Sequence, residues 1–224
     1  MRKSIPNSGA HSAIIFDLDG TLLNTLEDIA FAMNSVLRKH GYPEHSTSAY
    51  RYFVGGGLYN LVFHTIPENA RIPKLLNTYL DELLDEYSKC IDTQTKPYSG
   101  ICDMLEQLTQ KNIPMAILSN KAHEFMDEVV QQHFSKWNFK VVFGARPTVA
   151  TKPDPYSALE IASIMQIEPC KIAYLGDTDV DMQTAVNAGM YGIGAAWGFR
   201  TQTELIDNGA QLIIHHPMEL LNIF

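Results

Sequence analysis

Residues 13–21, Ala-Ile-Ile-Phe-Asp-Leu-Asp-Gly-Thr, decide the fold of this chain. The apolar run from Ala13 to Phe16 is typical of a short buried strand of a parallel sheet. Asp17 and Asp19 follow directly, and side chains two positions apart point the same way while a strand persists. Gly20 then permits a sharp turn. Because open α/β sheets bind ligands at the carboxyl ends of their strands, this stretch predicts a site that holds a cation, supplies a nucleophile, or does both.

Two other interpretations of the same residues have to be weighed. An ordinary turn also ends in Asp and Gly, because both are good turn residues. An EF-hand calcium loop needs glycine at its sixth position and glutamate at its twelfth, but this chain has Leu22 and Asp28 there. The calcium loop is therefore excluded, and the choice between a turn and an active site depends on the rest of the chain.

The composition is that of an ordinary globular protein. The chain has 224 residues, of which 46% are hydrophobic and 19% are charged, which suits one large domain or one domain with a smaller insertion. No apolar run approaches the roughly 18 residues that span a bilayer, and the start lacks the apolar region of a secretory signal. The three cysteines are far apart, which favours reduced thiols over disulfides or a zinc site: Cys90, Cys102 and Cys170. The expected location is cytoplasmic.

The net charge restricts the possible partners. A formal charge of −8 argues against sequence-independent binding to nucleic acid, which requires clustered Lys and Arg. We expect no nucleic-acid partner, no membrane partner, and a monomer or homodimer. An anionic substrate would need a local positive field in its site, and a divalent cation with a few Lys or Arg residues would supply it.

Short apolar runs alternate with amphipathic stretches over most of the chain. The predicted strands are Ala13–Phe16, Met115–Leu118, Lys140–Phe143, Ile172–Leu175, Tyr191–Ala196 and Gln211–Ile214. The predicted helices between them are Ile101–Lys111, Glu124–Phe134, Pro155–Met165 and Val180–Ala188. This alternation predicts an α/β fold with a doubly wound, mainly parallel sheet.

Residues 24–93 interrupt the alternation. They are expected to be almost entirely helical, with helices at Leu26–His40, Gly57–Thr65 and Ile72–Tyr87 separated by Gly and Pro breaks. A helical block between the first strand and the second strand–helix unit is an inserted domain. The core domain is then formed by residues 1–23 and 94–224, with linkers near Asn24 and at Thr93–Pro97.

A second acidic cluster, Gly176-Asp177-Thr178-Asp179-Val180-Asp181, follows the predicted strand Ile172–Leu175. Asp179 is explained by helix capping or by the helix dipole. For Asp177 and Asp181 a metal site is favoured, because Mg²⁺ binds through a few carboxylates together with water and substrate phosphate. Both carboxylate clusters thus follow a predicted buried strand, at the edge of the sheet where ligands bind.

Two smaller signals follow later in the chain. Ser119-Asn120-Lys121 comes directly after the predicted strand Met115–Leu118, where a hydroxyl, an amide and a helix N-terminus could hold an anion. Lys152 lies in the rigid turn Thr151-Lys152-Pro153 before a helix. Each signal alone is weak, since Ser-Asn commonly caps a helix and most lysines are solvated.

Taken together in this order, Asp-x-Asp-Gly-Thr, Ser-Asn, Lys-Pro and Gly-Asp-x-x-x-Asp resemble the haloacid dehalogenase superfamily of phosphohydrolases over essentially the full chain. The resemblance implies a Rossmann-like core, and the helical insertion is similar to the small α-helical cap of that family. The segments Asn187–Met190 and Ala196–Arg200 resemble the phosphoglycolate phosphatase branch.

The resemblance also implies roles for the acidic residues. Asp17 would be the nucleophile that forms an aspartyl-phosphate, and Asp19 would be the general acid and then the general base. Mg²⁺ would be held by the Asp17 carboxylate, the Asp19 backbone carbonyl and Asp177, with Asp181 binding directly or through water. Asp17 must be ionised and Asp19 protonated when the leaving group departs, so their environments must differ.

The remaining implied roles concern the substrate. Ser119 and the backbone N–H of Asn120 would bind phosphoryl oxygens, next to Gly20 and Thr21, and Lys152 would tether Asp17. The loop Arg51–Leu58, with Arg51 and Gly56, resembles the cap loop that closes over the leaving group. The arginines are candidate partners for a second anionic group, such as a carboxylate: Arg51, Arg146 and Arg200.

The predicted function is therefore a Mg²⁺-dependent phosphatase acting on a small phosphorylated metabolite, 2-phosphoglycolate or a similar monoester. Three alternatives stay open: a sugar-phosphate mutase of the β-phosphoglucomutase type, a pyrophosphatase on the same scaffold, and a non-catalytic phosphate-binding relative. Haloalkanoic acid dehalogenases lack the second aspartate as a family pattern, so Asp19 favours phosphoryl chemistry. The sequence does not select the substrate.

Overall fold

The computed structural model describes residues 11–224, and residues 1–10 of the expected core domain lie outside the described residues. Within the described part, a six-stranded sheet has the order β5-β4-β1-β6-β7-β8, and every neighbouring pair is parallel. Its strands are β1 (Ala13–Phe16), β4 (Met115–Ala122), β5 (Phe139–Ala145), β6 (Ile172–Gly176), β7 (Tyr191–Ala195) and β8 (Leu212–Ile214). The predicted doubly wound parallel α/β fold is confirmed.

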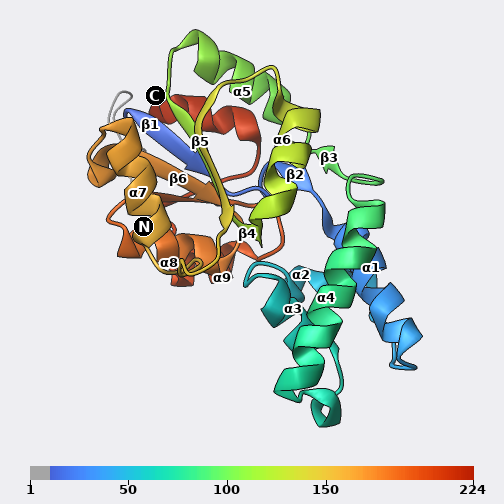
Figure 1. The fold of residues 1–224 in the computed structure, drawn as a ribbon. Helices are drawn as coiled ribbons and strands as arrows, with labels where there is room; N and C mark the ends of the chain where they lie inside the picture. The colour runs from blue at the N-terminus through green and yellow to red at the C-terminus, as the bar shows by residue number, and fades with distance from the viewer. Residues whose placement is uncertain (1–10) are drawn as a thin grey trace.

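Helices cover both faces of the sheet, as Figure 1 shows. Ile14 and Phe16 of β1 pack in a cluster with α5 (Ile101–Gln110), α6 (Met126–Phe134) and the 3₁₀-helix η5 (Pro217–Ile223). Ala13 and Ile15 point to the other face and join a cluster with α7 (Tyr156–Met165) and α8 (Asp179–Asn187). Successive strand residues point to opposite faces, so burial on both sides explains the continuous apolar run. The short helix α9 (Gln202–Asp207) packs beside β7 and β8.

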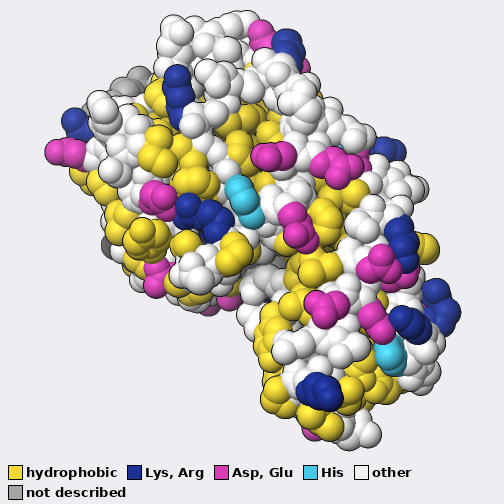
Figure 2. Space-filling model, in the orientation of Figure 1, with side chains coloured by type: hydrophobic (Ala, Val, Ile, Leu, Met, Phe, Trp, Pro, Cys, Tyr) yellow, Lys and Arg dark blue, Asp and Glu magenta, His cyan; other side chains and the backbone are white. Residues whose placement is uncertain are grey.

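The helical insertion has a hydrophobic cluster of its own. Its principal helices are α1 (Leu26–Lys39), α2 (Tyr50–Phe53), α3 (Leu58–Thr65) and α4 (Pro73–Cys90), joined by the 3₁₀ turns Thr47–Ala49 and Glu68–Ala70. Tyr50 and Leu61 are buried in this cluster, which two core side chains, Phe125 and Phe199, also join. Figure 2 shows the insertion as a smaller lobe set off by a narrowing, with Lys and Arg scattered among acidic side chains on the visible face.

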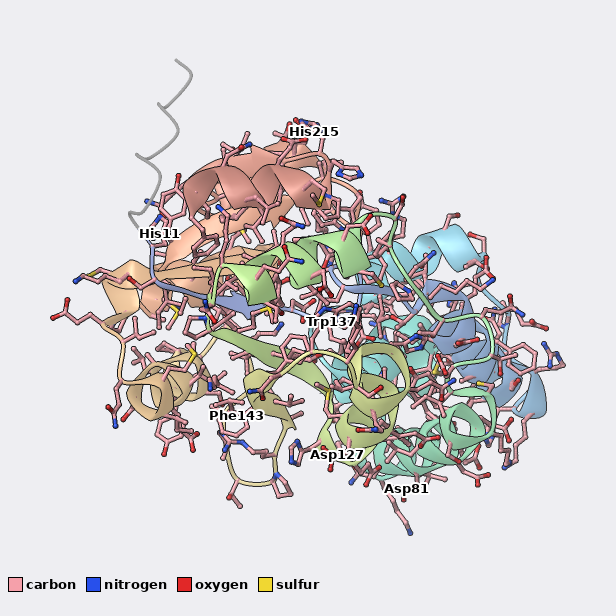
Figure 3. The ribbon with its side chains drawn as sticks, turned by 90° about the horizontal axis from the view of Figure 1, so that it is seen from above. His11, Asp81, Asp127, Trp137, Phe143 and His215 are labelled. Carbon is pink, nitrogen blue, oxygen red and sulfur yellow. The ribbon has the colours of Figure 1, made fainter. Side chains whose placement is uncertain are left out.

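The insertion leaves and rejoins the core at one place. Strands β2 (Leu23–Asn24) and β3 (Lys96–Pro97) pair antiparallel there. Beside them the buried carboxylate of Asp28 accepts hydrogen bonds from the backbone N–H groups of Gln94 and Thr95, at 2.9 and 3.0 Å. In the view from above, His11 at the start of β1 and Asp81 of α4 lie on opposite sides of the molecule (Figure 3). The insertion thus stands beyond the carboxyl ends of the strands; its exact limits, 24–93, stay a prediction.

One element differs from its predicted form in a way that affects the site. The strand expected to end at Leu118 continues to Ala122, so Ser119, Asn120 and Lys121 are buried strand residues, and the next helical turn, the 3₁₀-helix η3 (His123–Phe125), begins only after Ala122. The extension pairs with β5, which is also longer than the predicted strand Lys140–Phe143. A register shift in this pairing places Ala122 opposite Ala145. Such pairing depends on a neighbour distant in sequence.

Among the described residues, no helix is both long and apolar enough to cross a membrane.

Candidate active site

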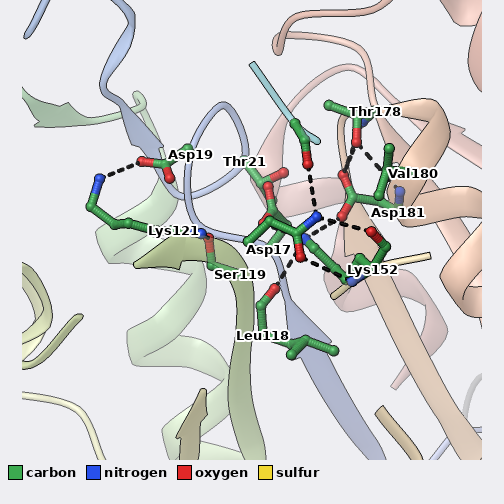
Figure 4. Close-up of polar contacts among 12 residues, drawn as sticks. Asp17, Asp19, Thr21, Leu118, Ser119, Lys121, Lys152, Thr178, Val180 and Asp181 are labelled. Atoms are coloured by element: carbon green, nitrogen blue, oxygen red, sulfur yellow. Dashed lines mark hydrogen bonds and ion pairs between the residues drawn. The ribbon is translucent and has the colours of Figure 1, made fainter. Parts of the chain in front are cut away.

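The predicted site residues meet at the carboxyl edge of the sheet, because β1 lies between β4 and β6. Asp17 follows β1, Ser119 is on the extended β4, and Asp177 follows β6. Their strands are parallel, so all three ends open toward the helical insertion. Figure 4 shows the contacts of Asp17 and Asp181 with Lys152, and those of Asp19 with Lys121 beside them.

Lys152 binds two of the carboxylates together. Its Nζ donates to Asp17 Oδ1 at 2.6 Å, to Asp181 Oδ1 at 2.7 Å and to the backbone carbonyl of Leu118 at 3.1 Å. All three ammonium protons are therefore used. The lysine side chain is only 3% exposed, so the ion pairs are almost completely shielded from water.

Asp177 is held in place by the turn that follows Asp19. Its Oδ1 accepts from Thr21 Oγ1 and its Oδ2 from the backbone N–H of Phe199, both at 2.7 Å. Gly20 has φ +94°, and a Cβ there would lie 2.7 Å from Asp177 Cγ. In this structure Gly20 and Thr21, predicted to bind substrate, support the Asp177 carboxylate.

Asp181 closes the first turn of α8. Its Oδ2 accepts from the backbone N–H and the hydroxyl of Thr178, the N-cap residue, at 3.0 and 2.6 Å. Its Oδ1 accepts from Lys152 and, at 3.4 Å, from Tyr174. One oxygen of Asp181 is thus paired with the Lys152 ammonium, whose charge opposes a cation, and the other is bound by Thr178, which favours an indirect role for Asp181 at a metal ion.

The three aspartates could hold a divalent cation. Oxygens of Asp17, Asp177 and Asp181 lie within 4.8 Å of one another, and all three residues are buried. Burial and the charge of Asp181 raise the pKa of Asp17 well above its usual range, against the opposing effect of Lys152, and the same two causes raise the pKa of Asp177 to about 7. Three buried carboxylates against one ammonium leave an excess of negative charge, which a hard cation with oxygen ligands would balance.

Asp19 lies apart from this cluster. Its Oδ1 accepts from Lys121 Nζ at 3.2 Å, and its side chain is 12% exposed. Lys121 also donates to the hydroxyl of Tyr87, on α4 of the insertion, at 2.5 Å. Burial lowers the pKa of Lys121, but the charge of Asp19 and the Tyr87 hydroxyl more than offset this and keep the lysine charged. The two aspartates of the motif thus have separate lysine partners.

Asn120 connects the core to the insertion. Its Nδ2 donates to the carbonyls of Gly55 and Lys152, both at 3.0 Å, and its Oδ1 accepts from the Lys152 backbone N–H at 2.9 Å. Ser119 is buried and lines the pocket. The Asn120 side chain therefore holds two loops in place.

A pocket lies between the aspartates and the insertion. Asp17, Asp19, Lys121 and Lys152 line its core side. Apolar side chains of the insertion line the other side, namely Ile29, Val54, Leu58, Leu61 and Tyr87. The glycine loop contributes Gly55 and Gly57, while Gly56 lies outside the lining.

The candidate arginines do not line this pocket. Arg51 donates to the carbonyls of Gly198 and Phe199, and Arg200 donates in return to the carbonyls of Arg51 and Val54. Arg146 lies elsewhere, 2.6 Å from Glu160 and over the ring of Phe143. In this arrangement Arg51 and Arg200 clasp the insertion to the core, and their role in binding substrate stays a prediction.

Three contributors to the site were not predicted. Thr178, with aspartate three residues later, matches the capping-box pattern, which could have identified it. Lys121 directly follows the Ser-Asn pair, but nothing in its local sequence indicates an aspartate partner. Tyr87 carries no sequence signal at all, because its contact depends on how the insertion packs on the core.

The chain is similar to known proteins over most of its length. The model of the haloacid dehalogenase-like hydrolase family matches residues 14–195. A phosphoglycolate phosphatase from Aquifex aeolicus is 30% identical over 83% of this chain and 85% of its own. An N-acetylmuramic acid 6-phosphate phosphatase from Pseudomonas aeruginosa is 26% identical over 94% and 93%.

A solved structure gives the same result for the fold. A protein from Lactobacillus delbrueckii subsp. bulgaricus, described provisionally as a phosphoglycolate phosphatase, superposes with a TM-score of 0.88 at 27% identity. The match covers 94% of this chain and 97% of that one. The similarity therefore spans the sheet and the helical insertion alike.

Proposed function

The chain belongs to the haloacid dehalogenase-like hydrolases and is a phosphatase, and we propose that it hydrolyses a small phosphate monoester, with Asp17 as nucleophile and Mg²⁺ as cofactor. Its first candidate substrate is 2-phosphoglycolate, which is supported by the names of several relatives. N-acetylmuramic acid 6-phosphate is the second candidate, on the same ground.

The contact that carries this proposal is the bond from Lys152 to Asp17. It fixes Oδ1 of Asp17 at 2.6 Å and leaves Oδ2 without a hydrogen bond from any described residue. The ammonium also favours the ionised, nucleophilic form of the carboxylate. Asp17 lines the pocket, so its free oxygen has access to a bound phosphoryl group.

The proposed reaction has two steps. In the first, Asp17 attacks phosphorus, the bond to the ester oxygen breaks, and Asp19 gives its proton to the departing oxygen. In the second, water attacks phosphorus and gives a proton to Asp19, while the bond to Asp17 breaks and inorganic phosphate forms. Both aspartates thereby return to their starting states.

Mg²⁺ fits the donor set of this site. The carboxylates of Asp17 and Asp177, together with the backbone carbonyl of Asp19, would hold it, and Asp181 would act through water or through Lys152. When bound, the cation would neutralise negative charge on the phosphoryl group. Thr21 and the Phe199 backbone keep Asp177 oriented toward that position.

The pocket restricts how a substrate enters. Its volume is only about 40 Å³, and side chains of the insertion form one of its walls. We propose that the insertion moves away from the core to admit substrate and then closes to exclude water from the reaction. None of the three candidate arginines lines the closed pocket, so an uncharged leaving group is as compatible with it as a carboxylate.

Phosphate release tests the proposal. The wild type should hydrolyse at least one ester of a panel containing 2-phosphoglycolate, N-acetylmuramic acid 6-phosphate and hexose phosphates, in Mg²⁺ but not in chelator, and inorganic pyrophosphate is assayed beside them. Asp17→Asn should lower kcat by roughly 10³-fold or more. Asp179→Asn is the control and should retain activity, because Asp179 lies two residues after Asp177 but does not line the pocket.

The outcomes separate the alternatives. Full activity of Asp17→Asn would refute the mechanism. An isomerised hexose phosphate in place of free phosphate would identify a mutase, and release of phosphate from pyrophosphate alone would identify a pyrophosphatase. A chain that binds phosphate but turns over no member of the panel would be a binding protein.

A further inference from the structure

Lys121 is a buried cation with no role in the reaction described above. Its side chain is 3% exposed, at the end of β4. Its Nζ lies 3.2 Å from Asp19 Oδ1, 2.5 Å from the Tyr87 hydroxyl and 4.6 Å from the centre of the Tyr87 ring. Burying an ammonium is unfavourable unless it is well paired, so these contacts require an explanation.

The contacts join parts of the molecule that move separately in the proposed reaction. Asp19 belongs to the loop after β1 of the core, whereas Tyr87 is on α4 of the insertion. Tyr87 is 2% exposed and its ring packs edge-on against Phe125 of the core. Lys121 can therefore hold both partners at once only when the insertion is closed on the core.

We propose that Lys121 is a positioning residue: Tyr87 holds it in place, and it orients the carboxyl group of Asp19 when the insertion closes. This proposal rests on the function proposed above. The lysine holds only Oδ1 of Asp19, and Oδ2 has no hydrogen bond from any described residue. The free oxygen is the one that carries the proton to the leaving group. Closure thus places the proton donor at the same time as it excludes water.

A purely structural ion pair would behave differently from a positioning residue. Loss of a structural pair lowers turnover of all substrates by similar factors, because it reduces the amount of well-folded enzyme. Loss of a positioning residue for the general acid affects substrates in proportion to their need for a proton. Phenyl phosphate and p-nitrophenyl phosphate have nearly the same shape, but only phenolate requires a proton to leave readily.

The test therefore measures kcat for these two esters and their ratio in a set of variants. Lys121→Met removes the ammonium, and Tyr87→Phe removes only the hydroxyl that holds it. Matched controls come from the same helix: Lys89→Met removes an exposed lysine paired with Asp85 and Glu86, and Tyr79→Phe removes a hydroxyl that contacts Tyr42.

We expect Lys121→Met to lower kcat for phenyl phosphate by 10-fold to 100-fold and for p-nitrophenyl phosphate by less than about 3-fold. Tyr87→Phe should change the ratio of kcat for the two esters in the same direction by about 3-fold. If Lys121→Met does not fold, the result for Tyr87→Phe decides the test. Both controls should leave the ratio at its wild-type value. In an Asp19→Asn background, Lys121→Met should not change the ratio further.

Equal losses for both esters in Lys121→Met and Tyr87→Phe would overturn the inference, as would a further change of the ratio in the Asp19→Asn background. Failure of the proposed function gives a different result, since Asp17→Asn would then still hydrolyse both esters. The inference fails alone when Asp17→Asn is inactive and the ratio is the same in all the other variants.

Discussion

Replacing Asp177 by asparagine should stabilise the metal-free protein while abolishing its response to Mg²⁺. Asp177 is fully buried beside Asp181, and burial and that charge raise its pKa to about 7. An ordinary aspartate has a pKa near 4, so the folded protein binds an additional proton between pH 4 and pH 7. Folding therefore weakens as pH rises through this range, and the full penalty is present above pH 7.

The penalty can be converted to a free energy. One pKa unit is about 1.4 kcal/mol, so a rise from near 4 to about 7 is worth about 4 kcal/mol. Because the neighbouring carboxylates share the titration, we take about half, 2 kcal/mol, as the gain from Asp177→Asn at pH 8. For a chain of this length that gain raises Tm by roughly 4–8 °C.

Thermal unfolding in chelator checks this prediction. The Tm difference between Asp177→Asn and wild type should be close to zero at pH 4 and grow up to pH 8, because other titrating groups cancel in the difference. Mg²⁺ at 100 times its Kd should stabilise the wild type by about 2.7 kcal/mol and leave the variant unchanged. Asp179→Asn, whose partly exposed carboxylate pairs with Arg200, is the control and should show neither effect. A constant difference between pH 4 and pH 8, or a variant less stable than wild type at pH 8, would refute the reasoning.

Three further substitutions test other parts of the site. Lys152→Met leaves two buried carboxylates without their shared ammonium and should lower the free energy of unfolding by about 3–5 kcal/mol in urea titrations; an unchanged midpoint would contradict this. Gly20→Ala should lower kcat about 100-fold or more, because Gly20 has φ +94° and the added Cβ would press against the Asp177 carboxylate. Gly41→Ala is the control: Gly41 has φ +68° but open space around it, so the substitution should cost only about 1 kcal/mol of stability and no activity. Arg51→Ala removes bonds between the insertion and two core carbonyls and should speed amide hydrogen exchange in residues 51–58 and raise KM several-fold; unchanged exchange would argue against the clasp.

The sheet could be predicted because its signal is local. Ala13–Phe16 is apolar at every position, and a strand covered on both faces requires this. The extension of β4 through Ser119 and Lys121 could not be predicted, because it depends on pairing with β5. Polar residues in a strand are explained only by the partners that they find in space.

The candidate site likewise contains residues with a local sequence signal and residues whose contacts depend on packing. Asp17, Asp177 and Lys152 could be identified because their order and their positions after strands or in turns are visible in the chain. The direction of the Arg51 guanidinium, toward core carbonyls rather than the pocket, is set by packing between the insertion and the core. The pairing of Lys121 with Tyr87 has the same origin, because the two residues are 34 positions apart in the sequence and one lies in the core and the other in the insertion.

The paired strands β2 and β3 have a consequence for how far the core depends on the insertion. Antiparallel partners lie about 5 Å apart, so Asn24 and Lys96 present the core with two adjacent ends that a tight turn could join. Whatever is spliced between them leaves the strand order and the carboxylate cluster untouched. The sheet that brings Asp17 and Asp177 together therefore does not depend on the length or content of the insertion.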